Sequence, residues 1–157
     1  MAYNSTLTNA VKYLEWLPGA SDYPTATVAA VIWDAAYLEV YGQLTAKGIT
    51  IGSGDNSEKQ ARDIEALLTS HKIGAAGQMQ SNGEIDVYTQ WLKTEADRLL
   101  AMFLDPAQGY EYAEALGASI ARKGPRVDSL AVSYPNADQD LSDLENPLDE
   151  FTVEGDI

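Results

Sequence analysis

The chain has 157 residues, no cysteine and a single histidine, and its 24 acidic and 10 basic residues give a formal net charge of −14. Without cysteine it can form neither a disulfide nor a thiolate metal site, and His71 would be the sole imidazole of any zinc site or catalytic triad. The length suffices for one domain with a hydrophobic core, and the acidity argues against nucleic-acid binding, which normally depends on a basic patch.

A short first helix is expected within residues 1–17, where Leu7, Val11 and Leu14 recur at helical spacing and Ser5, Thr6 or Thr8 could cap it. Pro18-Gly19 then ends it. Trp16 and Leu17 lie at its exit, and we expect both to be core contacts.

The second helix is expected to open at Thr25 or Thr27 and to run to about Thr45. Small alanines along it would let another helix approach closely. Its apolar residues predict one buried face, made of Val28, Val31, Ile32, Ala35, Leu38 and Leu44.

Three aromatic residues of the second helix, Trp33, Tyr37 and Tyr41, follow one another in four-residue steps beside that face. One interpretation is an aromatic ridge that closes the core. The other is a contact surface for another subunit, since aromatic side chains are enriched at interfaces. Both interpretations remain open on the sequence.

A glycine-rich segment, Gly42–Asn56, follows and predicts a projecting loop with a brief extended piece at Ile49–Ile51. It matches neither a Walker loop nor a dinucleotide fingerprint, so it gives no support for phosphate binding. The third helix is expected from Ser57, with Gln60 at capping-box spacing, to about His71. Its predicted buried face is Ala61, Ile64, Leu67 and Leu68.

The longest apolar stripe lies at Glu84–Leu104, after a polar link at Gly74–Gly83. Asp105-Pro106 should end this helix, because proline biases its predecessor away from helical backbone. Residues 110–122 have weaker helical character. The predicted face of the long helix comprises Ile85, Tyr88, Leu92, Leu99 and Phe103, with Ala96 and Leu100 beside them.

No catalytic or cofactor-binding set is evident. The nearby carboxylates Asp34 and Glu39, and likewise Glu95 and Asp97, lack the spacing that would place either pair on one helix face. We therefore expect a non-enzymatic protein without cofactor or metal. No apolar stretch approaches the length of a membrane span, so no membrane partner is expected.

The composition changes after Gly124-Pro125, where nine acidic residues stand against one basic residue, Arg126. The sequence thus predicts an all-α bundle of about four to five helices over residues 1–124 and an extended acidic tail over 125–157. One interpretation of the tail is a plain acidic segment. We favour a docking segment that orders on a partner, with apolar anchors at Leu130, Val132, Tyr134, Leu141, Leu144, Leu148 and Phe151.

Residues 6–104 resemble the head–tail adaptor proteins of tailed viruses, also called connector or head-completion proteins. The likeness lies in the order of elements and in two segments, Leu7–Leu14 and Ala35–Gly42, which are similar to that family's opening helix and its D-x-Y-L-G-like turn. The segment Gly48–Asp55 is long for the family, and the tail is strongly charged for a docking segment.

The resemblance implies a structural virion protein at the neck between head and tail. Such proteins assemble as a ring, typically a dodecamer, under the portal protein, contact neck or tail proteins, and let DNA pass without sequence-specific binding. An acidic lumen would repel DNA phosphates. The alternative is a small acidic binding module or inhibitor, such as a DNA mimic, that acts on a basic partner protein.

Overall fold

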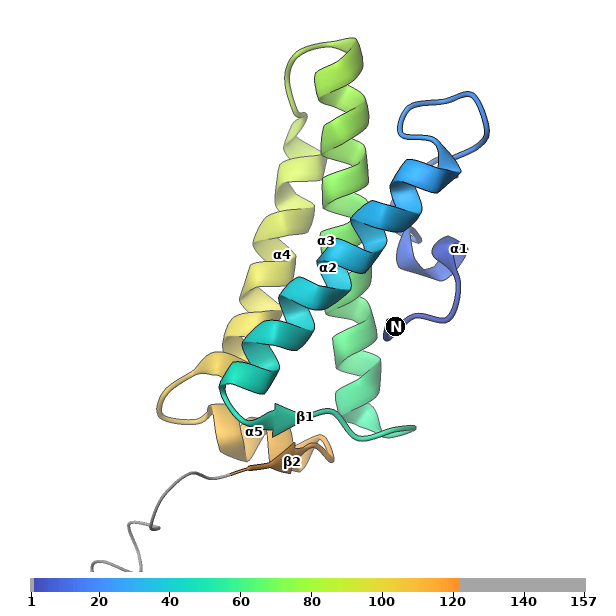
Figure 1. The fold of residues 1–157 in the computed structure, drawn as a ribbon. Coiled ribbons are helices and arrows are strands. Elements are labelled where there is room, and N and C mark those ends of the chain that lie inside the picture. The colour runs from blue at the N-terminus through green and yellow to red at the C-terminus, as the bar shows by residue number, and fades with distance from the viewer. Residues whose placement is uncertain (1, 122–157) are drawn as a thin grey trace, which may run out of the picture. The chain divides into compact units, whose positions relative to one another are not determined.

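Helix α3 (Asn56–Ser81) is the central element of the computed structural model, which describes residues 2–121 (Figure 1). Residues 64–70 are all buried, so neighbouring elements cover α3 on every side. Helices α2 (Ala26–Ala46) and α4 (Val87–Leu104) pack along it, and the one-turn α1 (Leu7–Ala10) covers a further side. The all-α helical bundle predicted from the sequence is confirmed.

Three small elements close the end of the bundle where α3 begins (Figure 1). They are α5 (Gly109–Ala115) and two short strands, β1 (Ile49–Thr50) and β2 (Ser119–Ile120), which pair antiparallel. The extended piece expected near Ile49 is confirmed as β1. The loop was expected to project, but the Ile49 side chain is buried. α5 stops earlier than predicted because Gly117 adopts φ 100°, in the left-handed region.

The carboxylate of Asp55 caps α3 and replaces the predicted Ser57 capping box. Its Oδ1 accepts hydrogen bonds from the backbone N–H of Ser57 at 3.0 Å and from the Ser57 hydroxyl at 2.6 Å. These contacts lower the pKa of Asp55, and the hydrogen bond from the Ser57 hydroxyl has the largest effect. A Cβ on Gly52 or Gly117 would collide with this carboxylate, so both glycines are needed for the backbone to pack closely around Asp55.

α3 also continues beyond its predicted end near His71, through most of the predicted polar link, to Ser81. The glycines that suggested a link are close-approach positions. A Cβ on Gly77 would lie 3.2 Å from the Tyr23 carbonyl oxygen, and one on Gly74 would lie 3.3 Å from Leu14 Cδ2. His71 is therefore in mid-helix, with Nδ1 2.8 Å from the carbonyl oxygen of Thr89.

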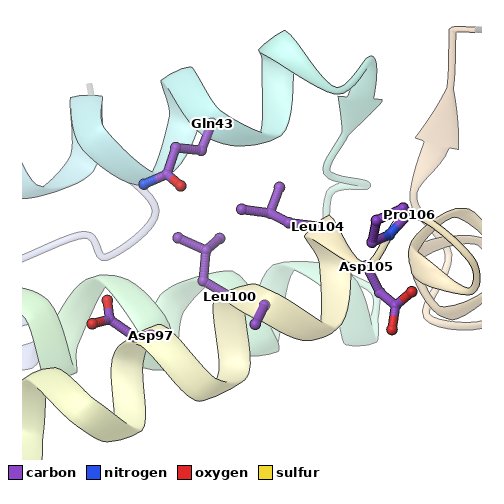
Figure 2. Close-up of a pocket in the computed structure, with 7 residues that line it drawn as sticks. Gln43, Asp97, Leu100, Leu104, Asp105 and Pro106 are labelled. Carbon is purple, nitrogen blue, oxygen red and sulfur yellow. The ribbon is translucent and has the colours of Figure 1, made fainter.

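α4 ends at Leu104, directly before Asp105-Pro106, as predicted (Figure 2). It begins at Val87, because the Asp86 carboxylate accepts a hydrogen bond from the Thr89 N–H at 2.8 Å. Its buried residues include Leu92, Ala96, Leu100 and Phe103, whereas Tyr88, predicted to be in the core, is exposed.

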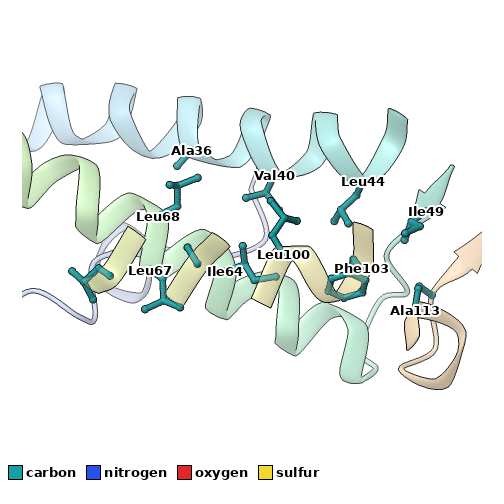
Figure 3. Close-up of a cluster of buried hydrophobic side chains, with 13 residues drawn as sticks. Ala36, Val40, Leu44, Ile49, Ile64, Leu67, Leu68, Leu100, Phe103 and Ala113 are labelled. Atoms are coloured by element: carbon teal, nitrogen blue, oxygen red, sulfur yellow. The ribbon is translucent and has the colours of Figure 1, made fainter. Parts of the chain in front are cut away.

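The main core lies between α2, α3 and α4 and extends to α5 (Figure 3). Phe103 is fully buried there and packs edge-on against Tyr112, with ring centroids 5.1 Å apart. Trp16 and Leu17 take no part in this core: both are exposed, so their predicted role is wrong. The first helix ends at Ala10, and these residues follow it in irregular backbone.

A buried carboxylate holds the N-terminal strap, which we define as residues 2–6, against α3. Glu65 accepts hydrogen bonds from the N–H of Tyr3 at 3.1 Å, the N–H of Asn4 at 2.7 Å and the Asn4 side-chain amide at 2.6 Å. Arg62 Nε donates to the Tyr3 carbonyl oxygen at 3.0 Å. Three N–H donors thus compensate the burial of Glu65 and place the Tyr3 ring on α2.

Candidate functional site: the outward faces of helices α2 and α4

Helix α2 is apolar on every side, because Asp34 and Glu39 are its only charged residues. The side that packs on the bundle is not the one predicted. Only Leu44 of the expected face is buried, and Val31 and Leu38 lie in solvent. The residues of α2 that are buried are Ala29, Ala36, Tyr37, Val40 and Leu44.

An outward surface, which we call the α2 face, consists of three residues of the predicted stripe, Val31, Ala35 and Leu38, together with Gly42. Their spacing of four, three and four residues places them on one side of the helix. Val31 is 67% exposed and Leu38 is 56% exposed. A helix that is apolar all round normally has both sides covered, so the α2 face has the character of a contact surface.

The three aromatic residues predicted as an interface differ in their surroundings. Tyr37 is buried and packs edge-on against Tyr3, with ring centroids 5.1 Å apart, and burial raises its pKa. Tyr41 stacks on Tyr37 at 5.4 Å and is 46% exposed beside the α2 face. Trp33 is half-buried, and its indole Nε1 is buried without a hydrogen-bond partner.

A second outward surface, which was not predicted from the sequence, lies on α4. We call Val87, Trp91, Thr94 and Arg98 the α4 face; all are exposed, Val87 to 82% and Trp91 to 47%. Trp91 stacks with Tyr88 at 6.0 Å between ring centroids. The signal that could have revealed this surface is the position of Val87 and Trp91 opposite the buried side of the helix.

A groove between α2 and α4 is lined by apolar residues such as Leu104 and Pro106 and by two carboxylates (Figure 2). Both carboxylates are engaged in local contacts. Asp97 pairs with Lys93 at 2.8 Å, and Asp105 accepts a hydrogen bond from the Ala107 N–H at 2.7 Å, which lowers the pKa of Asp105. The groove therefore presents no pair of free carboxylates for acid–base chemistry.

Within residues 2–121, no group of three or more His, Asp or Glu side chains is arranged to hold a metal ion. None of the helices in this range is long and apolar enough to cross a membrane. The predicted tail anchors, from Leu130 to Phe151, and the boundary at Gly124-Pro125 lie outside the described residues. The docking tail therefore stays a prediction.

The chain matches no protein-family model, no curated protein and no solved structure.

Proposed function

We propose that the protein is a non-enzymatic structural subunit that assembles into a ring and acts as a head–tail adaptor of a tailed virus. In this role the ring lies under the portal protein at the neck of the virion, extends the DNA channel and joins head to tail. The observation that supports assembly best is the outward apolar side of α2, with Val31 and Leu38 in solvent. The virion role rests on the resemblance of residues 6–104 to that family.

Self-association would remove the apolar α2 face from water, which is favourable. Burying a Val or Leu side chain fully stabilises by about 1.5 to 3 kcal/mol relative to leaving it exposed. A ring repeats this gain at every interface. The net charge of −14 opposes association, and added salt screens that repulsion.

The surface charge also suits a DNA channel. Residues 2–121 carry 15 acidic and 7 basic side chains, a net charge of −8, and ion pairs with carboxylates engage five of the basic ones. Such a surface offers little to hold DNA phosphates, so a bore lined by it would let DNA pass.

The test is the mass and shape of the purified full-length chain. Native mass spectrometry over a range of protein and salt concentrations should show one closed multimer that salt favours, and negative-stain microscopy should show rings. A chain that stays monomeric at every concentration and salt level would refute the ring.

The alternative, an acidic module that binds a basic protein, is favoured by one observation: nine acidic residues against one basic residue after Gly124. Salt separates the two functions. A complex that depends on charge weakens steeply as salt rises, whereas an apolar ring persists.

A further inference from the structure

We infer that copies of this chain pack head to tail, with the α2 face of one copy against the α4 face of the next. This inference rests on the proposed ring and names its interface. The occupant of each face is thus a second copy of the chain.

Symmetry gives the first argument. A ring built from identical subunits needs two different surfaces on each subunit, since a self-complementary surface closes a dimer and stops. The bundle has two such surfaces. Each lies opposite the buried side of its own helix, and the buried sides of α2 and α4 both pack against α3.

Shape gives the second argument. Both faces have the same spacing, at residues 31, 35, 38 and 42 on α2 and at residues 87, 91, 94 and 98 on α4. The α2 face has small residues, Ala35 and Gly42, where the α4 face has large ones, Trp91 and Arg98. When the two helices run parallel and in register, the large side chains lie opposite the small ones and interdigitate, so the helices can approach closely.

Charge gives the third argument. Both charged residues of α2 are acidic, although Glu39 already pairs with Lys72 of α3 at 3.0 Å. α4 carries Lys93 and Arg98, and their side chains are 44% and 59% exposed although each pairs with a carboxylate of its own helix. An α2–α4 contact therefore brings cations as well as carboxylates to the interface, whereas an α2–α2 contact would bring together the acidic residues of both copies.

The absence of cysteine permits a direct experiment. One cysteine is placed on each face, Ala35→Cys and Thr94→Cys, and the assembled chain is treated with a short bis-maleimide. The chain with both changes should give a ladder of covalent multimers, whereas each single change should give monomer only. A covalent dimer from Ala35→Cys alone would show an α2–α2 contact and overturn the inference.

A mixing experiment provides an independent check. Val31→Glu with Leu38→Glu disables the α2 face, and Val87→Glu with Trp91→Glu disables the α4 face. An unpaired charge in an interface should weaken association on the order of a hundredfold or more, so each variant should be monomeric. An equal mixture retains one intact pair of faces, and cysteines at Ala35 and Thr94 on those intact faces should then yield a cross-linked heterodimer and nothing larger.

The control adds the same two charges at exposed positions away from both faces, Thr8→Glu with Gln80→Glu, and should still form rings. Circular dichroism and melting show that each variant is folded. Rings that persist in either face variant, or a mixture without heterodimer, would overturn the inference while leaving the proposed ring intact. A monomeric unmodified chain would instead refute the proposed function itself.

Discussion

Replacing Glu65 tests whether its buried carboxylate holds the N-terminal strap. Glu65→Leu keeps the size of the side chain but removes the acceptor of three N–H groups on Tyr3 and Asn4. Each buried donor left unpaired costs about 1 to 3 kcal/mol, so the two Asn4 donors give about 2 to 6 kcal/mol with the strap in place. Because the strap can detach into water and relieve part of this cost, we expect a loss of about 2 to 4 kcal/mol.

The assay is denaturant unfolding, followed by circular dichroism, in the background of Val31→Glu with Leu38→Glu so that assembly does not contribute to the free energy. Hydrogen exchange at the Asn4 amide reports detachment of the strap. The control, Glu15→Gln, changes an exposed carboxylate and should leave the midpoint unchanged. An unaltered free energy of unfolding, with the Asn4 amide still protected in Glu65→Leu, would show that the Glu65 carboxylate does not hold the strap.

Four further outcomes are expected. Leu92→Asp, at a fully buried position, should destabilise the bundle by on the order of 4 kcal/mol or more and unfold it; a helical variant with an unchanged melting temperature would contradict the core. Gly48→Ala (φ 81°) should destabilise more than Gly54→Ala (φ 80°), because its Cβ would lie 2.5 Å from the Ala121 carbonyl oxygen whereas Gly54 faces open space; equal denaturation midpoints would count against that contact. The Thr89 N–H lowers the pKa of Asp86, so the stabilisation by this cap is present above the ordinary pKa of 3.8 and is lost as pH falls through the lowered pKa. In melting curves recorded across the acid range, Asp86→Asn should therefore show a weaker dependence of melting temperature on pH than the unmodified chain. An identical pH profile would argue against the cap. Deleting residues 125–157 should leave helix content and melting unchanged and abolish docking to the portal, whereas undiminished docking would exclude the tail as the docking segment.

The sequence predicted the ends, the caps and the buried side of a helix where a residue close by along the chain decides them. Proline ended α4 at Leu104, and the spacing of Leu92, Ala96 and Phe103 placed the core side of that helix correctly. Threonine at position 25 capped α2 as expected, through a hydrogen bond from the Val28 N–H. Each of these signals acts within a turn or two of the chain.

The errors arose where the deciding contact is distant in sequence. Gly74 and Gly77 weaken a helix locally, but they allow Leu14 and Tyr23 to approach α3 closely. The sequence could not predict which side of α2 packs on the bundle, because a helix that is apolar on every side has no preferred inner face. The same property points to the candidate site, since the apolar side that does not pack on the bundle is the α2 face.

The proposed adaptor function is tested most directly by cross-linking mass spectrometry, with absolute quantification, on particles purified from the source of this chain. An adaptor ring predicts a low, ring-like copy number per particle, cross-links between the α2 and α4 faces of neighbouring copies, and cross-links from the segment after Gly124 to a portal-sized protein. Absence of the chain from the particles would contradict the adaptor function and favour the acidic binding module.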